Sequence, residues 1–362
     1  MSLSIGIIGL PNVGKSTLLN ALSNAGAEAS NYPFCTIDCN QGTVTVPDAR
    51  LAELDRILEP DEVIPATVTY IDIAGLVEGA SRGEGLGNKF LHHIREANVL
   101  AHVLRCFQGG GVSHVRGDID PIRDLGIVET ELFLADLERV ERWIDKERNN
   151  AKARKKGERK ELDFLMQVRE SLSNEQRISR EGLADYKLHM LEELQLLADK
   201  PVILVINAGE EDPYGKNDAC GRVRERFPER ELFVVSAKIE EEISKLEPEE
   251  RGEFMKELGL DLDAKSRIIE SCHEMLGLIR YYTTAHGKLQ AWSVIGGTKA
   301  PEAAGKIHTD MEKGFIKAEV MGFDDLVRYG SKAEVQHHGL LKTEGHDYVV
   351  KDGDVIHFLF NR

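Results

Sequence analysis

The stretch Gly9–Ser16, GLPNVGKS, has the spacing G-x-x-x-x-G-K-[ST] of a phosphate-binding P-loop. The backbone N–H groups of such a loop line a concave nest for phosphate oxygens, and the following helix adds the positive end of its dipole. Lys15 is expected to reach the β- and γ-phosphates, and the Ser16 hydroxyl is expected to bind Mg²⁺. The motif therefore restricts the chain to folds in which a buried strand enters a glycine-rich turn and a helix leaves it.

The residues around the motif fit that arrangement. Ile5–Ile8 is an apolar run that predicts a buried strand, and Thr17–Leu22 predicts an amphipathic helix. Strands alternate with helical patterns along the first part of the chain, which predicts an α/β fold with a mostly parallel sheet. The strands expected there are Ser4–Leu10, Thr43–Val46, Thr67–Ile73, Val99–Cys106, Val202–Asn207 and Leu232–Ser236.

Composition narrows the class of protein. The chain has 362 residues, of which 41% are hydrophobic and 30% charged, and no apolar stretch reaches the length of a membrane span. The first strand begins almost at the N-terminus, so no secretory or transit segment is expected. Five cysteines without metal-site spacing predict reduced thiols and a cytoplasmic protein. The net charge of −16 argues against DNA or general nucleic-acid binding, so an RNA contact needs a local basic patch.

Two later segments differ in character from the first. Residues 127–200 are rich in Glu, Lys, Arg and Leu, contain no proline and predict an antiparallel helical hairpin. One arm is expected to carry Leu132, Leu134, Leu137, Val140 and Ile144, and the other arm Leu188, Leu191, Leu194 and Leu197. The basic run Lys152–Lys160 lies near the expected tip and is either a solvated face or an RNA or partner contact.

The last part of the chain predicts a small α+β domain of about 80 residues. Its expected strands include a pair around a turn at His286–Gly287, and a second turn at Lys351–Asp354 leads into the final strand. The strands expected in this domain are Tyr281–Ala285, Lys288–Val294, Phe315–Val320 and Val355–Phe360.

Further motifs separate a nucleotide switch from other P-loop proteins. Asp72–Gly75 ends a strand with the form D-x-x-G, so Asp72 is expected to hold Mg²⁺ through water and Gly75 to sense the γ-phosphate. Thr36, between the two motifs, is expected to supply a second hydroxyl to the metal.

The residue that usually orients the attacking water is absent from the sequence. Leu76 follows Gly75 where Ras-type switches place a glutamine, and leucine cannot orient water. Asn12, as a ligand of a monovalent cation such as K⁺, and His114, on a glycine-rich segment, are the candidates to compensate.

The base-recognition motif also departs from the usual form. Asn207-Ala208-Gly209-Glu210 stands where GTPases have N-K-x-D, so lysine is absent and the carboxylate is one methylene longer. That displacement spoils a bidentate fit to guanine and favours tolerance of, or preference for, adenine. Ser236-Ala237-Lys238 matches the S-A-K motif that lines the base. The expected nucleotide contacts are Asn12, Val13, Gly14, Lys15, Ser16, Thr17, Gly75, Asn207, Ala208, Glu210, Ser236, Ala237 and Lys238.

Together these motifs resemble the YchF / Obg-like ATPase family of P-loop proteins. Gly9–Thr17, Asp72–Leu76 and the N-x-x-E motif carry the resemblance, as do Gly85–Leu91 and the C-terminal stretch Lys351–Phe358, which is similar to a TGS domain. The resemblance covers essentially the whole chain. It implies a TRAFAC-class, GTPase-like P-loop sheet, a coiled-coil insertion and a C-terminal β-grasp (TGS) domain.

The resemblance also implies a function: an ATPase that prefers ATP over GTP, uses Mg²⁺ with Ser16 and Thr36 as direct ligands, and associates with ribosomes. We expect residues 1–126 and 200–278 to form the nucleotide domain, 127–199 the hairpin and 279–362 the TGS domain. The small residues Ala208 and Gly209 depart from some relatives and predict a looser base pocket. The alternatives are an Obg-class GTPase with relaxed base specificity and a scaffold that binds ribosomes or RNA without hydrolysis.

Overall fold

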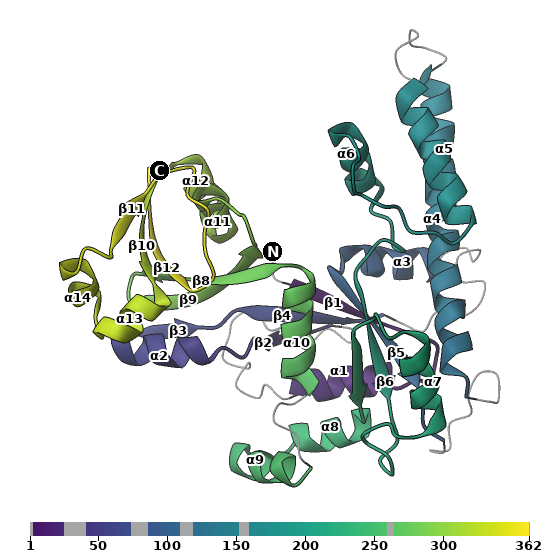
Figure 1. Ribbon diagram of the computed structural model, residues 1–362, viewed down its shortest axis with the longest axis horizontal. Helices are drawn as coiled ribbons and strands as arrows, with labels where there is room; N and C mark the ends of the chain where they lie inside the picture. Colours follow the sequence, from purple (N-terminus) through teal and green to yellow (C-terminus); the bar gives the residue numbers. More distant parts are fainter. Residues whose placement is uncertain are drawn as a thin grey trace.

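A computed structural model of the chain describes residues 3–24, 41–73, 86–108, 119–151, 159–258 and 264–361. It has three parts: a central sheet with helices around it, a long helical projection, and a second sheet that holds the C-terminus (Figure 1). Four residues discussed above, and most of the basic run, lie outside the described residues: Thr36, Gly75, Leu76, His114 and 152–158.

The central sheet confirms the predicted α/β architecture. Its strand order is β2-β4-β1-β5-β6-β7, and every neighbouring pair is parallel except β2 and β4. All six predicted strands are present, with ends that differ by two residues or fewer. Their bounds are β1 Leu3–Ile8, β2 Gln41–Thr45, β4 Thr67–Asp72, β5 Val99–Arg105, β6 Val202–Asn207 and β7 Leu232–Val235.

Helices cover both faces of this sheet, because neighbouring strand residues alternate between two apolar clusters. Val103 and Val205 belong to the larger cluster, whereas Leu104 and Leu204 belong to the smaller one beside α4 and α7. The helices of this part are α1 Lys15–Asn24, α3 Leu86–Glu96, α7 Asp218–Arg226, α8 Ala237–Ser244, α9 Pro248–Glu257 and α10 Ala264–Met275.

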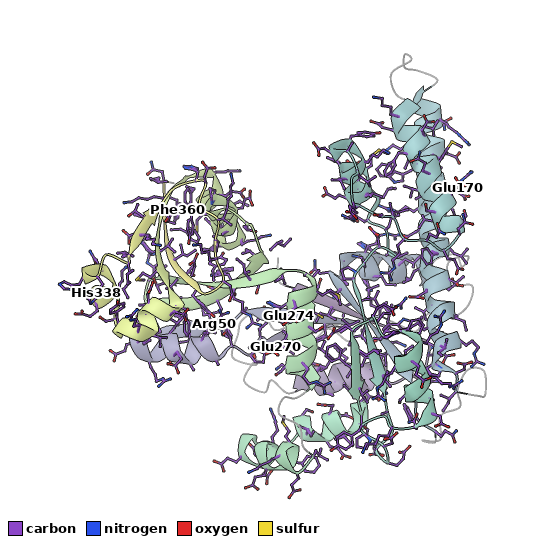
Figure 2. The ribbon with its side chains drawn as sticks, in the orientation of Figure 1. Arg50, Glu170, Glu270, Glu274, His338 and Phe360 are labelled. Atoms are coloured by element: carbon purple, nitrogen blue, oxygen red, sulfur yellow. The ribbon has the colours of Figure 1, made fainter. Side chains whose placement is uncertain are left out.

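The helical projection differs from the prediction in its second arm. Its first arm is α4, Pro121–Ala151, whose early turns also pack on the central sheet through Val128 and Leu132. The arm that packs along α4 is α5, Arg159–Ser173, as Figure 2 shows beside Glu170. The predicted second arm was wrong, because Leu188, Leu191 and Leu194 lie on a separate short helix, α6 Asp185–Leu194.

The chain leaves the helical direction between α5 and α6 because two residues adopt left-handed backbone conformations. Glu175 has φ 53° and Gly182 has φ 72°. The leucines of α6 nevertheless reach the same apolar cluster as α4 and α5, where Leu191 and Leu194 are buried. Helical periodicity therefore identified most of the buried residues but not the helix that carries them, since Leu134, Leu137 and Leu188 are only half-buried.

The C-terminal part is an α+β unit, as predicted. Its sheet has the order β11-β10-β12-β8-β9-β3, and β8 and β9 form a hairpin whose turn residues His286 and Gly287 have φ 51° and 74°. Positive φ at both positions is the geometry of a tight hairpin turn. The elements are β8 Leu278–Ala285, β9 Lys288–Ile295, α11 Ala300–Ile307, α12 Thr309–Lys313, β10 Phe315–Gly322, α13 Phe323–Tyr329, α14 Lys332–His337, β11 Lys342–Glu344 and β12 Asp354–Phe360.

This unit also incorporates a segment from early in the chain. Between β2 and β4 the chain forms α2, Ala49–Leu58, and β3, Glu62–Ile64, and β3 pairs in parallel with β9. Leu51 and Leu54 of α2 are buried in the C-terminal cluster. The division at residues 126, 199 and 278 stays a prediction, and residues 49–64 pack with the C-terminal sheet rather than with the nucleotide sheet.

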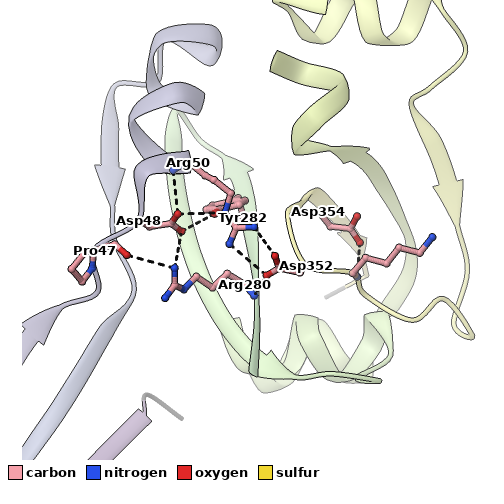
Figure 3. A network of polar contacts seen from close by, with 8 residues as sticks. Pro47, Asp48, Arg50, Arg280, Tyr282, Asp352 and Asp354 are labelled. Carbon is pink, nitrogen blue, oxygen red and sulfur yellow. Dashed lines mark hydrogen bonds and ion pairs between the residues drawn. The ribbon is translucent and has the colours of Figure 1, made fainter. Parts of the chain in front are cut away.

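Polar contacts fix this segment in place (Figure 3). The buried carboxylate of Asp48 caps α2 by accepting from the Arg50 N–H, and it accepts a hydrogen bond of 2.7 Å from the Tyr282 hydroxyl. Arg50 forms an ion pair of 2.7 Å with Asp352, which also accepts from the backbone N–H of Arg280 at 2.8 Å. The segment that connects β2 and β4 is thereby tied to the C-terminal unit.

Candidate functional site

The phosphate loop begins where β1 ends at the centre of the sheet. Gly9, Asn12 and Gly14 have positive φ angles of 147°, 64° and 96°. A Cβ on Gly9 would lie 2.6 Å from the Val103 carbonyl oxygen, and one on Gly14 would lie 2.2 Å from Asn207 Nδ2. Both glycines of the motif are therefore required by the backbone conformation and by close neighbours.

Lys15 is folded onto this loop. Its Nζ donates to the carbonyl oxygens of Gly9 at 3.2 Å and Leu10 at 2.8 Å, and the residue is only 7% exposed. Burial lowers the pKa of Lys15 to about 8, and the nearby Asp72 carboxylate partly offsets this effect. A buried cation at the loop favours an anionic ligand, because a phosphate replaces the hydration that the ammonium has lost.

The predicted metal ligands Ser16 and Asp72 are in direct contact. Ser16 Oγ donates to Asp72 Oδ2 at 2.7 Å, and the buried Oδ1 of Asp72 has no hydrogen-bond partner among the described residues. A hydroxyl and a carboxylate oxygen without a partner are the hard oxygen donors that Mg²⁺ prefers. The residues present thus fit a magnesium ion at the mouth of the loop.

The base-recognition motif is joined to the phosphate loop by Asn207 at the end of β6. Its Nδ2 donates to the Val13 carbonyl at 2.8 Å, and its Oδ1 accepts from the Ala237 N–H at 3.0 Å. One amide side chain therefore connects the three predicted motifs, because Ala237 belongs to the S-A-K sequence.

An open pocket of about 370 Å³ lies along these motifs. It extends from the phosphate loop to the carboxyl ends of β5, β6 and β7, the edge at which open α/β sheets bind ligands. The residues that line it are Gly14, Thr17, Phe107, Gln108, Asn207, Ala208, Gly209, Glu210, Glu211, Ser236, Ala237, Lys238 and Glu241.

Two polar groups in this pocket bear on specificity. Glu210 forms an ion pair with Lys238, with Nζ 2.8 Å from the carboxylate, and both side chains are partly exposed. The hydroxyl of Ser236 is buried and has no partner within the described residues. The wall of the pocket therefore includes a carboxylate already paired with a cation, and a buried hydroxyl without a partner within the described residues.

The structure brings most of the predicted site together and adds residues that the sequence analysis missed. Asn12–Thr17, Asp72, Asn207–Glu210 and Ser236–Lys238 converge, whereas Thr36, Gly75 and His114 lie outside the described residues. Asn12 is exposed on the loop. Phe107, Gln108, Glu211 and Glu241 were missed, although Phe107 and Gln108 lie within three residues of the end of β5 at the binding edge.

The sheet, the glycine-dependent loop and the Ser16–Asp72 pair define a P-loop protein of the GTPase-like class. Comparison agrees: a family model described as "50S ribosome-binding GTPase" matches residues 4–131. A second, YchF-GTPase_C, described as "Protein of unknown function (DUF933)", matches residues 278–361.

Similarity to whole proteins is more specific. The chain is 44% identical over 366 residues to the ribosome-binding ATPase YchF of Bacillus subtilis, and 43% identical over 363 residues to that of Escherichia coli O157:H7. Each alignment covers 100% of both chains. The chain belongs to the YchF family.

Solved structures support this assignment. The Schizosaccharomyces pombe YchF GTPase is 35% identical, with a TM-score of 0.86 over 99% of this chain and 98% of that chain. A GTP-binding protein from Pyrococcus horikoshii, 19% identical with a TM-score of 0.60 over 99% of this chain and 100% of that chain, supports the fold alone. In the described parts of the chain, no helix is both long and apolar enough to span a membrane.

Proposed function

We propose that this protein is a Mg²⁺-dependent, nucleotide-controlled switch that hydrolyses ATP in preference to GTP and associates with ribosomes in the cytoplasm. The observation that carries the proposal is the continuous pocket from the phosphate loop to Glu210 and Lys238. Two relatives named as ribosome-binding ATPases, aligned over their full length, support the same proposal.

Magnesium has an evident place in this scheme. Ser16 and Asp72 would hold the ion, Asp72 through water, and the sequence adds Thr36 as a further hydroxyl ligand. When bound, the ion neutralises charge on the β- and γ-phosphates. Lys15 and the backbone N–H groups of the loop orient the phosphates, and the hydrogen bond between Ser16 and Asp72 holds the two oxygens side by side.

Adenine preference follows from the chemistry of the base pocket. A guanine-reading carboxylate must accept two hydrogen bonds from N1–H and the N2 amino group. Glu210 is longer than the usual aspartate, and Lys238 already occupies its oxygens at 2.8 Å. Guanine would compete with Lys238 for this carboxylate, whereas adenine has no N1–H donor and makes no such demand.

Calorimetric titration of ATP and of GTP tests this proposal. We expect tighter binding of ATP, and we expect the Glu210→Asp variant to shift selectivity toward GTP because the shorter carboxylate regains the bidentate position. Glu241→Asp, at the same pocket but outside the base motif, is the matched control. Preference of the unmodified protein for GTP would instead support the Obg-class alternative.

Hydrolysis needs a group in place of the missing glutamine. We propose Asn12 as a K⁺ ligand and His114 as a water-positioning residue, in keeping with their positions in the sequence. Single-turnover hydrolysis in potassium and in sodium chloride tests the first role. Loss of hydrolysis in His114→Ala with unchanged ATP affinity tests the second. If ATP binds but no phosphate is released with ribosomes and potassium present, the non-hydrolysing scaffold is the better description.

Ribosome association is tested by cosedimentation with purified ribosomes in ATP and in ADP. We propose the basic run as the RNA contact, and neutralising Lys152, Arg154, Lys155 and Lys156 should weaken binding and flatten its salt dependence. Binding with an unchanged salt slope would assign the contact to another face.

A further inference from the structure

Arg105 is a buried cation that the P-loop motif does not account for. It is the last residue of β5 and is only 3% exposed. Its strand lies between β1, which leads into the phosphate loop, and β6, which leads into the base motif. In the register of the sheet, Arg105 lies directly beside Asn207.

The contacts of Arg105 reach both halves of the pocket. One guanidinium nitrogen, Nη1, donates to the carbonyl oxygen of Asn12 at 3.1 Å, and Nε donates to the carbonyl of Phe107 at 3.3 Å. The guanidinium carbon also lies 4.4 Å from the centre of the Phe107 ring, a cation–π distance. The side chain therefore connects the phosphate loop with the aromatic residue in the pocket wall.

A physical reason makes this contact important. The loop can present its N–H groups to phosphate only if its carbonyl groups point outward, and buried carbonyls need donors. Lys15 serves the carbonyls of Gly9 and Leu10, and Asn207 serves that of Val13. Arg105 serves Asn12, the residue between them in the loop, whose φ of 64° is left-handed, a conformation that is uncommon outside glycine and that asparagine adopts more readily than most residues.

We propose that Arg105 is a positioning residue of the nucleotide site: it holds the Asn12 peptide in its left-handed conformation and fixes Phe107 in the wall. This inference rests on the proposed nucleotide-binding function but not on the choice of base. Lysine cannot replace arginine here, because a single ammonium lacks the planar fork that reaches two carbonyls while lying over a ring.

The test is a double-mutant cycle on the full-length protein, with dissociation constants for Mg-ATP and Mg-GTP measured by calorimetry. Arg105→Met is expected to weaken both nucleotides by a similar factor of about ten, corresponding to about 1.4 kcal/mol. Arg105→Lys, which keeps the charge, is expected to weaken both by at least threefold and serves as the second variant if the methionine variant folds poorly.

Asn12→Gly separates positioning from general stability. Glycine adopts positive φ without strain, so the effect of Arg105→Met should be at least threefold smaller in the Asn12→Gly background. Arg224→Met is the matched control, because Arg224 donates to two backbone carbonyls, of Gly215 at 2.6 Å and Tyr214 at 3.1 Å, in a different loop. Its dissociation constants should stay within twofold of those of the unmodified protein.

Two results would overturn the inference. One is nucleotide binding by both Arg105 variants within twofold of the unmodified protein, and the other is an equal effect of Arg105→Met with and without Asn12→Gly. Absence of ATP and GTP binding by the unmodified protein would instead refute the proposed function. Binding of GTP alone leaves the cycle measurable with GTP, so the two failures are distinguishable.

Discussion

Replacing Asn207 by alanine should destabilise the centre of the nucleotide sheet. Asn207 is 4% exposed and makes two hydrogen bonds, to Val13 at 2.8 Å and from Ala237 at 3.0 Å. Each such bond contributes about 0.5–1.5 kcal/mol net, and a buried group left without a partner costs about 1–3 kcal/mol. The Val13 carbonyl and the Ala237 N–H both lose their partner, so we expect a loss of about 2–6 kcal/mol.

The appropriate assay is native-state hydrogen exchange of the β6 amides, because it reports local opening in a chain with several units. The free energy of opening should fall by that amount in Asn207→Ala. Asn174→Ala is the control, since its amide makes one exposed bond to the Glu170 carbonyl at 3.0 Å, and a change below about 0.5 kcal/mol is expected. A loss below about 1 kcal/mol in Asn207→Ala would refute the view that this side chain joins the three motifs.

Three further predictions concern protons and the C-terminal unit. Burial lowers the pKa of Lys15 to about 8, and a bound triphosphate favours the charged form, so ATP binding at pH 8 should take up protons. Calorimetry in two buffers of different ionisation enthalpy checks this, and equal heats in both buffers would contradict it. Burial, and secondarily the nearby Arg280, lowers the pKa of His273 to about 4. Between about pH 4 and 6.5 the unfolded state therefore binds more protons than the folded state, and the free energy of unfolding decreases as the pH falls through that range. We expect His273→Gln to lessen the loss of urea stability from pH 7 to 5 by about 2 kcal/mol, and an unchanged pH slope would exclude this role. Tyr282→Phe removes the hydroxyl that donates to buried Asp48 at 2.7 Å, and it should lower the free energy of opening of α2, measured by hydrogen exchange, by about 1–3 kcal/mol. Tyr186→Phe, at an exposed tyrosine, is the control and should have no effect. Equal results in the two variants would argue against the network.

Much of the fold was predictable because its signals are local. The six strands of the central sheet, the hairpin turn at His286–Gly287 and the buried leucines of the helical projection all follow from periodicity and turn residues. The second arm of the projection was not predictable in the same way. Both 159–173 and 188–194 have helical spacing, and this local pattern does not say which of them packs along α4; the chain turns between them at the left-handed residues Glu175 and Gly182.

The site shows the same division between local and long-range information. The motifs at Gly9–Ser16, Asp72 and Asn207–Glu210 could be read directly, since each is a short pattern with a chemical reason. Arg105 and Phe107 carry no such pattern, and their importance comes from the neighbouring strands β1 and β6. Strand order is set by contacts between residues far apart in the chain, which a local pattern does not encode.

The sequence by itself therefore determined the class of protein, the phosphate loop and the altered base motif, because backbone conformation and side-chain chemistry there depend on residues close together in the chain. Only the tertiary structure decided that Asn207 and Arg105 hold successive carbonyls of that loop, that Lys238 pairs with Glu210, and that residues 49–64 pack in the C-terminal unit. Each of these depends on burial and partners brought together by the folded sheets.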